Sequence, residues 1–232
     1  MTDLPKPPES VGTQEHTKTN RMFELIPISP LRALLPATVI PDLPMSDEDL
    51  ELASAVALDS ARIRCERDEH RRIRLYAPTP EPIWLMIQMI RREFITWINQ
   101  KQAGGQIGLR RRLFLDNSSI ICPDLAYFAP GADKIRINIE FGRILRVRPA
   151  CVVEICPHLR DLPQYKNRML RGMMGGIQVG MLIFPQEQRA NIYTLDSEPE
   201  TIDGDYVVGT EGLEGLVIKL SALWKLDAYR RG

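Results

Sequence analysis

The chain has 232 residues, of which 44% are hydrophobic and 26% are charged, as in an ordinary soluble globular protein with one sizeable core. Its 30 Lys and Arg residues balance its 30 Asp and Glu residues, so the formal net charge is zero. This balance excludes a protein that attracts nucleic acid through a global basic field, and any contact with DNA must come from a local patch of positive charge.

The N-terminal region is rich in proline and lacks hydrophobic periodicity, so we predict a flexible arm over residues 1–45. Asp3 and Glu9 precede any apolar run, which argues against a signal peptide. The apolar stretch from Met22 to Ile40 is interrupted by prolines and is too broken to span a bilayer. We therefore expect a cytoplasmic protein with no membrane partner.

Regular structure is expected to begin at Ser46, which fits a helix capping box with Asp49. The helix that follows is predicted to run to about Leu58. Two short strands are predicted after it, over residues 61–66 and 73–76, with a charged turn between them.

The clearest helix is predicted over residues 83–100, shortly after Pro80 and Pro82. Its apolar residues recur at helical spacing and form one face, which is typical of a helix that packs on a core. Gly104 and Gly105 are expected to end it. The apolar face consists of Ile83, Met86, Ile87, Met89, Ile90, Phe94, Trp97 and Ile98.

Beyond Gly105 the apolar pattern changes to that of strands, interrupted by one further helix from Arg160 to Met174. This order of helices and strands predicts an α+β (mixed α/β) fold in which helices flank a curved mixed sheet. We assign residues 46–226 to one domain and residues 227–232 to a C-terminal tail. The predicted strands are 107–116, 119–128, 135–147, 151–155, 179–184, 189–195 and 216–220.

The four cysteines argue against a zinc site, because they form no C-x-x-C pair and no second Cys or His pair completes a ligand set. Reduced, partly buried thiols are expected instead. The cysteines are Cys65, Cys122, Cys151 and Cys156.

Three segments carry residues suited to phosphodiester chemistry: CPDLAYF with Asp124, RPACVVEI with Glu154, and RDLPQYKNRML with Lys166. Cleavage of a phosphodiester needs a hard divalent cation, an attacking water and a cationic stabiliser around one phosphorus. An Asp and a Glu supply oxygen ligands for Mg²⁺, and a nearby Lys stabilises charge on the phosphate oxygens. Each feature alone is commoner as a turn, a capping residue or a solvated lysine, so the prediction depends on their combination.

In the same order, these segments resemble motifs of the Uma-type restriction endonuclease family within the PD-(D/E)XK nuclease superfamily. The resemblance runs from about Ser46 to Trp224 and includes RCER, whose acid is Glu66. It implies a restriction-endonuclease-like core and metal-dependent hydrolysis of DNA phosphodiester bonds, with Mg²⁺ or Mn²⁺ as cofactor. The implied metal ligands are Asp124 and Glu154. The implied catalytic residues are Glu66, Asp124, Glu154 and Lys166.

The lysine departs from the usual pattern of the superfamily, in which it lies two residues after the motif Glu. Cys156 occupies that position here. The resemblance therefore implies that the role of the lysine has moved to the following helix, where Lys166 would act on the attacking water or on the phosphate. We expect its side chain to point inward at the edge of the sheet, on a helical face shared with apolar residues. Those residues are Leu162, Met169 and Leu170.

Two groups of arginines are candidates for contact with DNA phosphates, because such contacts rely on Arg and Lys side chains. A solvated outer face is an equally good interpretation of both groups. The candidates are Arg110, Arg111, Arg112, Arg143, Arg146 and Arg148.

Two functions remain open beside a DNA endonuclease. One is a non-catalytic nuclease-fold module that binds nucleic acid or a protein partner. The other is a dimerisation or scaffold protein, which apolar side chains in the site would favour. Convergence of the acids and the lysine within one pocket would favour the enzyme. DNA is the expected partner, while RNA as substrate and a homodimer remain open.

Overall fold

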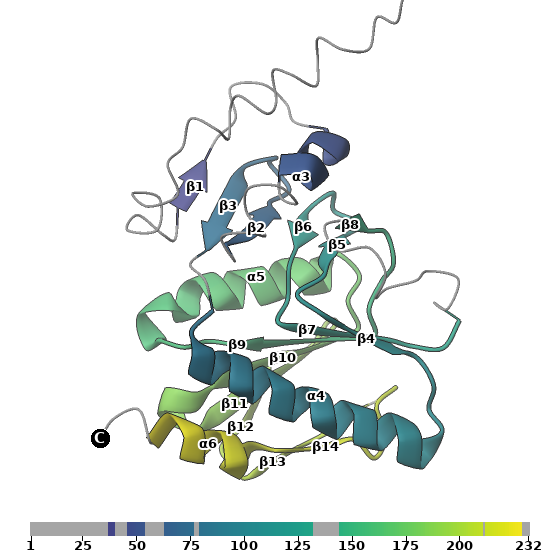
Figure 1. Cartoon of the computed structure of the whole chain (residues 1–232), viewed down its shortest axis with the longest axis vertical. Helices are drawn as coiled ribbons and strands as arrows, with labels where there is room; N and C mark the ends of the chain where they lie inside the picture. Colours follow the sequence, from purple (N-terminus) through teal and green to yellow (C-terminus); the bar gives the residue numbers. More distant parts are fainter. Residues whose placement is uncertain are drawn as a thin grey trace, which may run out of the picture.

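The described part of the chain folds into two six-stranded sheets and one two-stranded sheet, with helices between and around them (Figure 1). This computed structural model describes residues 37–39, 46–53, 63–76, 79–131, 144–210 and 212–228. The predicted mixed α+β fold, with mixed sheets flanked by helices, is confirmed.

The central sheet has the strand order β12-β11-β10-β9-β7-β4. Its neighbouring strands are antiparallel except β9 and β10, which are parallel and are joined through helix α5. Every residue of β7, β9 and β10 is buried, which agrees with their nearly continuous apolar sequences. The strands are β4 (Gln106–Leu109), β7 (Leu125–Phe128), β9 (Cys151–Ile155), β10 (Val179–Phe184), β11 (Arg189–Thr194) and β12 (Glu200–Ile202).

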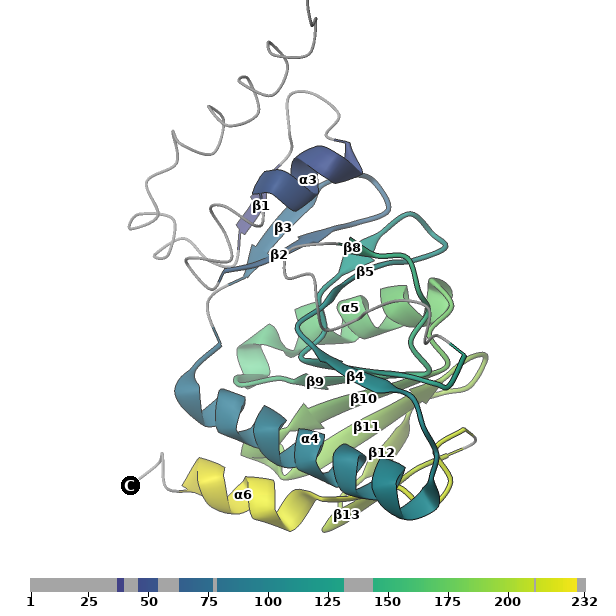
Figure 2. The same ribbon diagram turned by 45° about the vertical axis from the view of Figure 1, so that its right-hand side comes forward.

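Helices α4 (Glu81–Lys101) and α5 (Leu162–Met174) cover opposite faces of the central sheet (Figure 2). Side chains alternate along β9, so Val153 packs in the cluster of α4 and Val152 packs in the cluster of α5. Glu154 has the parity of Val152. Its side chain is therefore directed to the face that α5 covers.

Helix α4 confirms the clearest prediction made from hydrophobic periodicity. It starts after Pro80 with Pro82 in its first turn, where the missing backbone N–H of proline leaves no helical hydrogen bond unmade. It ends before Gln102, which adopts the left-handed conformation with a φ of 52°. The residues of its buried face are Ile83, Met86, Ile87, Ile90, Phe94 and Trp97.

The outer sheet has the strand order β1-β3-β2-β6-β5-β8, and α3 (Asp47–Ala53) lies beside it (Figure 1). Leu50 of α3 belongs to the same buried cluster as Ile73 and Leu75 of β3, so this helix and sheet share a small core. The strands are β1 (Ala37–Val39), β2 (Arg64–Arg67), β3 (Ile73–Tyr76), β5 (Arg112–Phe114), β6 (Ile120–Ile121) and β8 (Ile144–Leu145).

The chain crosses between the two sheets where single strands were predicted. The predicted strand 107–116 is divided at Arg110, which has a φ of 50°, into β4 of the central sheet and β5 of the outer sheet. The predicted strand 119–128 is divided around Pro123 into β6 and β7. Asp124 therefore lies where the chain enters the central sheet from the outer one.

The C-terminal part contains a two-stranded sheet and a helix. The second strand of this sheet confirms the strand predicted over residues 216–220, whereas the first strand and the helix were not predicted. Strands β13 (Tyr206–Val208) and β14 (Val217–Lys219) pair antiparallel, and α6 (Leu220–Ala228) follows directly. Leu220, Leu223 and Trp224 of α6 join the core on the α4 side. Two single turns of 3₁₀ helix complete the described elements, at Leu159–Asp161 and Pro185–Glu187.

Several predictions fall wholly or partly outside the described residues. The arm predicted over residues 1–45 does so except for residues 37–39, which form β1 and pair with β3, contrary to the expectation for that stretch. Of the predicted strand 135–147, the structure describes residues 144–147, with β8 at Ile144–Leu145. None of the helices in the described ranges has the length and apolar character needed to cross a membrane.

The four cysteines are free and fully buried, in agreement with the expectation of reduced thiols. Burial raises the pKa of Cys122 to about 11, so its thiol stays protonated at neutral pH.

Candidate active site

Three acids from three different strands meet beside helix α5. Glu66 lies on β2, Asp124 directly precedes β7, and Glu154 lies on β9. Leu125 pairs with Val153 in the antiparallel register of β7 and β9, which places Asp124 opposite Glu154 on the α5 face of the sheet.

The three carboxylates are almost completely shielded from solvent, with relative exposures of 0% for Glu66, 1% for Asp124 and 2% for Glu154. Burying a charged group is costly unless oppositely charged groups and hydrogen bonds compensate it. The site therefore depends on what surrounds these oxygens.

Arg64 of β2 bridges two of the acids. Its Nη1 donates a hydrogen bond of 3.0 Å to Oε2 of Glu154, and its Nη2 donates to Oδ1 of Asp124. The other oxygen of Asp124, Oδ2, accepts a 3.0 Å hydrogen bond from the backbone N–H of Ile155. Both oxygens of Asp124 are thus engaged by the protein.

Arg168 of α5 supplies a second buried positive charge. Its Nη2 forms an ion pair with Oε2 of Glu154, and its Nε lies 3.5 Å from Oε1 of Glu66. The guanidinium carbon lies 5.0 Å from the ring centre of Tyr76 and 4.6 Å from that of Tyr165. These two rings and the carboxylates hold Arg168 in a site where only 2% of the residue is exposed.

Glu66 differs from the other two acids in having an oxygen to spare. Its Oε1 accepts a 3.0 Å hydrogen bond from the backbone N–H of Cys122. Its Oε2 is buried and has no hydrogen-bond partner among the described residues. This oxygen is the acceptor in the cluster that is free to bind a water or a ligand atom.

The electrostatic environment moves the pKa values of the two facing acids, Asp124 and Glu154, in opposite directions. Burial raises the pKa of Glu154 to about 7, although Arg168 and Arg64 oppose this rise. Burial also acts to raise the pKa of Asp124, but Arg64, Arg110 and the Ile155 N–H outweigh it, so this pKa lies below its ordinary value. Asp124 is therefore ionised at neutral pH, whereas Glu154 exchanges its proton near pH 7.

The expectation that Lys166 points inward is wrong. Lys166 is exposed on α5, whereas Arg168, Met169, Gly172 and Met173 form the buried face of that helix. Two positions along an α-helix turn the side chain by about 200°, so Lys166 and Arg168 point to nearly opposite sides. Sequence reasoning missed Arg168 and Arg64.

The signal that could have found Arg168 is its helical spacing from other residues of the buried face of α5. Met169, Gly172 and Met173 follow it at one, four and five positions, which is the spacing of a single helical face. Leu170, which was taken as part of the inward face, is 48% exposed. An arginine in phase with the small and sulfur-containing residues was the better candidate for the buried cation.

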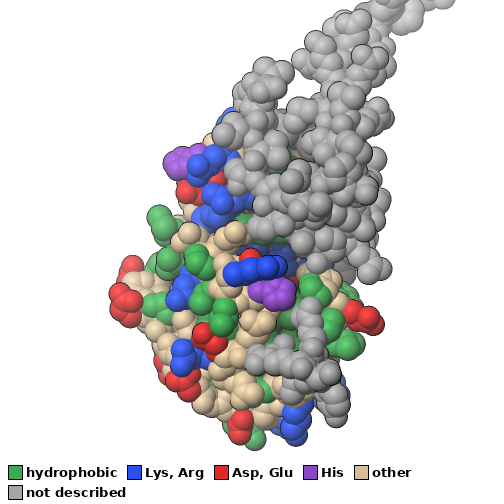
Figure 3. Space-filling model, turned by 90° about the vertical axis from the view of Figure 1, so that its left-hand side faces the viewer, with side chains coloured by type: hydrophobic (Ala, Val, Ile, Leu, Met, Phe, Trp, Pro, Cys, Tyr) green, Lys and Arg blue, Asp and Glu red, His purple; other side chains and the backbone are tan. Residues whose placement is uncertain are grey.

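The predicted basic surface is not present as such in the described part of the chain. Arg111 and Arg112 are buried, and Arg143 lies outside the described residues. Arg146 pairs with Asp47 and stacks on Phe114, while Arg148 pairs with Asp116. On the face drawn in Figure 3, blue and red side chains both lie among apolar and neutral ones.

Arg110 lies close to the acids. Its Nη2 is 3.7 Å from Oδ1 of Asp124, and its guanidinium lies 5.8 Å from the ring centre of Trp84. The side chain is 23% exposed, so it connects the acid cluster to the molecular surface.

The acids have the right donor chemistry for a divalent cation but the wrong surroundings. Carboxylate oxygens are the ligands that Mg²⁺ prefers. However, the charges of Glu66, Asp124 and Glu154 are already balanced by three guanidinium groups, and Arg64 bridges the two acids opposite each other. The described residues contain no group of three or more His, Cys, Asp or Glu side chains arranged to hold a metal ion. A divalent cation does not fit while Arg64 lies there.

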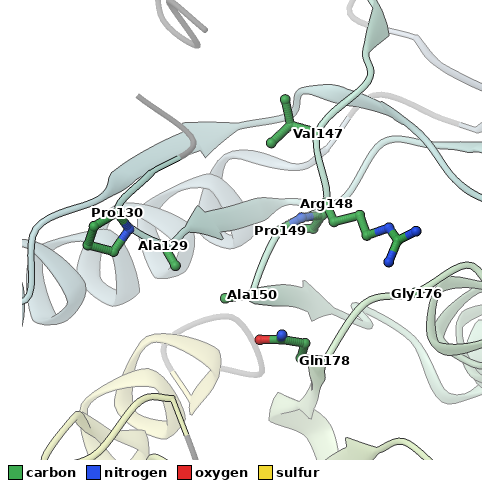
Figure 4. Close-up of a pocket in the computed structure, with 8 residues that line it drawn as sticks. All are labelled: Ala129, Pro130, Val147, Arg148, Pro149, Ala150, Gly176 and Gln178. Carbon is green, nitrogen blue, oxygen red and sulfur yellow. The ribbon is translucent and has the colours of Figure 1, made fainter. Parts of the chain in front are cut away.

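A separate cavity of about 350 Å³ lies away from the acids (Figure 4). Ala150 lines it just before the start of β9, whereas Glu154 is near the end of that strand. Arg148 is its charged residue, and this side chain pairs with Asp116. The cavity is therefore not the acid site. Its lining residues are Ala129, Pro130, Val147, Arg148, Pro149, Ala150, Gly176 and Gln178.

Comparison with known proteins shows the fold. No family model matches the chain, and no curated protein matches it. Among solved structures, it is similar to one from Anabaena variabilis described as "a putative nuclease belonging to DUF820", with 22% sequence identity and a TM-score of 0.55. The match covers 70% of this chain and 90% of that chain. This chain thus shares the fold of that protein.

Proposed function

We propose that the chain is a nuclease that hydrolyses phosphodiester bonds of DNA at the acid cluster. One observation carries this proposal: the acids Glu66, Asp124 and Glu154, from three separate segments of the chain, meet two buried arginines, one on β2 and one on α5. The nuclease-type fold supports the same function. The helix cation is Arg168 in this proposal, in place of Lys166.

The roles of the side chains follow from their chemistry. Guanidinium groups bind phosphate oxygens through paired hydrogen bonds, so Arg168 and Arg64 would stabilise the charge that builds on the phosphate. Glu66, whose buried Oε2 has no hydrogen-bond partner among the described residues, would orient the attacking water and accept its proton. The water oxygen bonds to phosphorus as the P–O bond to the leaving sugar oxygen breaks, and a solvent water protonates that sugar oxygen.

Mg²⁺ or Mn²⁺ belongs to the proposal as the cofactor that the family resemblance implies, with Asp124 and Glu154 as its ligands. When bound, such an ion neutralises charge on phosphate oxygens. Because Arg64 bridges these two acids, its displacement is a condition for binding the ion.

The test is incubation of the purified chain with supercoiled plasmid, linear duplex, single-stranded DNA and RNA, each with Mg²⁺, Mn²⁺ or EDTA. We expect cleavage of DNA that falls by about 10²-fold or more in Asp124→Asn and Arg168→Met, the scale of losing one electrostatic stabiliser. Lys166→Met is the matched control on the same helix and should cleave like the unaltered chain. Absence of cleavage in every condition by the folded chain contradicts the proposal.

A second candidate function is a non-catalytic nuclease-fold module that binds nucleic acid or a protein partner. The complete burial and ion pairing of the acids favour it, because a structural ion-pair network has these same properties. The site is filled by charged side chains rather than apolar ones, which does not favour the pure scaffold protein. Binding of DNA without cleavage in the same experiment would select the binding module.

A further inference from the structure

The guanidinium of Arg64 lies between the two facing acids of the cluster. It contacts one oxygen of Asp124 and one oxygen of Glu154, the pair expected to hold the ion. We infer that Arg64 is a built-in cation that closes this metal site. Asp124 and Glu154 bind a divalent cation only when the guanidinium of Arg64 leaves them.

Charge balance supports this role. Three acids face Arg64, Arg168 and Arg110, so the cluster as folded has no excess negative charge to attract an ion. The Coulomb energy of a buried site is large and is not screened by water, so this balance decides whether a cation binds. Without Arg64, the acids would outnumber the cations, and Oδ1 of Asp124 and Oε2 of Glu154 would each lose a hydrogen bond.

Burial explains why Arg64 holds the site when no ligand is present. Arg64 is 7% exposed, and both of its terminal nitrogens contact the acids. A guanidinium stays charged in proteins, so it cannot vacate the site by losing a proton. It can leave only by exchanging the carboxylates for another anion.

A phosphodiester is an anion of the right geometry for this exchange. A guanidinium forms the same paired hydrogen bonds with phosphate oxygens as with carboxylates. A nucleic-acid phosphate that takes Arg64 would free the acids, so binding of DNA and of the divalent cation would each strengthen the other. This coupling rests on the proposed function, because it takes DNA as the ligand, but it does not depend on cleavage.

The first experiment measures Mn²⁺ binding by titration calorimetry on the full chain without DNA. The unaltered chain should bind Mn²⁺ at least about tenfold more weakly than Arg64→Gln. Arg67→Gln is the matched control, since Arg67 is also a buried arginine of β2 but pairs with Asp47. Arg67→Gln should bind Mn²⁺ as weakly as the unaltered chain. The double variant Arg64→Gln with Asp124→Asn should lose the gain in Mn²⁺ affinity that Arg64→Gln shows alone.

One outcome overturns the inference: an Arg64→Gln protein that circular dichroism shows to be folded binds Mn²⁺ no more tightly than the unaltered chain. If Arg64→Gln does not fold, Arg64→Lys takes its place. A lysine keeps the charge but cannot donate to both acids through a planar fork, so a smaller gain in Mn²⁺ affinity is expected. No gain in folded Arg64→Lys then overturns the inference as well.

The second experiment repeats the titration with a saturating short duplex. After the Mn²⁺ binding of the duplex itself is subtracted, the unaltered chain should bind Mn²⁺ more tightly with the duplex than without it. Asp124→Asn should show no such gain. No gain overturns the coupling to DNA. Mn²⁺ binding by Arg64→Gln without any plasmid cleavage would sink the proposed hydrolysis but leave Arg64 as the closing cation. Mn²⁺-dependent cleavage by the unaltered chain, with no gain in Mn²⁺ affinity in Arg64→Gln, would support the proposed hydrolysis but contradict the role of Arg64 as the closing cation.

Discussion

Arg168 shows how a single buried side chain organises the site. It contacts two acids and two aromatic rings, and it is among the largest fully buried side chains of the described part. Its long stem and flat guanidinium fill the space between α5 and β3 while neutralising charge. The same side chain therefore serves both packing and charge balance.

We predict that Arg168→Met destabilises the fold by about 3–5 kcal/mol, because it leaves Glu154 and Glu66 buried without their partner. Lys166→Met, on the exposed side of the same helix, should change stability by no more than about 0.5 kcal/mol. Urea denaturation followed by circular dichroism measures both. Similar losses in the two variants would contradict the assignment of Arg168 as the buried cation.

A pH-dependent prediction concerns Glu154, whose pKa is raised to about 7. Because the folded state then holds this proton more tightly than the unfolded state, the contribution of Glu154 to stability falls as pH rises from about 4.5 to 7. The lowered pKa of Asp124 acts in the opposite sense and only below about pH 4, where its contribution is lost.

Glu154→Gln should therefore flatten the pH dependence. The free energy of unfolding of the unaltered chain, relative to that of Glu154→Gln, should decline between pH 5 and pH 7 by an amount on the order of 1–3 kcal/mol. Urea denaturation at pH 5, 6 and 7 measures this difference. Parallel curves for the two proteins would show that Glu154 does not titrate in this range.

At the scale of elements, the sequence predicted helices and strands whose hydrophobic pattern is local. It missed the divisions of strands, which depend on the strands with which they pair. Helix α4 was predicted nearly to its ends because six residues at helical spacing bury one face. The strand divisions at Arg110 and Pro123 were missed, since alternation continues whichever sheet a residue joins. Helix α6 was missed, because the predicted strand 216–220 ends at its first residue and nothing was assigned beyond it in the described part.

The acids of the candidate site were nominated by their motifs, but their surroundings were not. Nothing in the local sequence RCER indicates that Arg64 reaches residues 60 and 90 positions away. On α5, existence of the helix was predictable, but its rotation was not, and an error of two positions exchanged Arg168 for Lys166. Partners distant in sequence are specified by the fold and not by a pattern.

The packing of α5 on β10 gives a prediction at this scale. A Cβ added at Gly180 would collide with Sδ of Met169, whereas one added at Gly204 would meet open space. Gly180→Ala should therefore cost about 1–3 kcal/mol through overpacking, and should weaken cleavage by displacing the neighbouring Arg168. Gly204→Ala is the control and should be close to neutral. Equal thermal midpoints for the two variants would show that the Met169 side chain moves aside without loss of stability.

At the scale of the whole molecule, the acid cluster lies at the junction of two sheets. Arg64 and Glu66 come from β2 of the outer sheet, Asp124 and Glu154 from the central sheet, and Arg168 from the helix between them. The ion pairs thus connect every layer around α5. Any shift of one sheet against the other would therefore change the distances between the charged groups of this cluster.

The crossing of the chain at Pro123 and Asp124 has a consequence for how the protein folds. A chain in which only the central sheet had formed would hold Asp124 and Glu154 against α5 without the guanidinium of Arg64, which arrives on β2. Such an intermediate would have uncompensated buried charge and would be poorly populated. The two sheets should consequently become ordered together, in one cooperative transition.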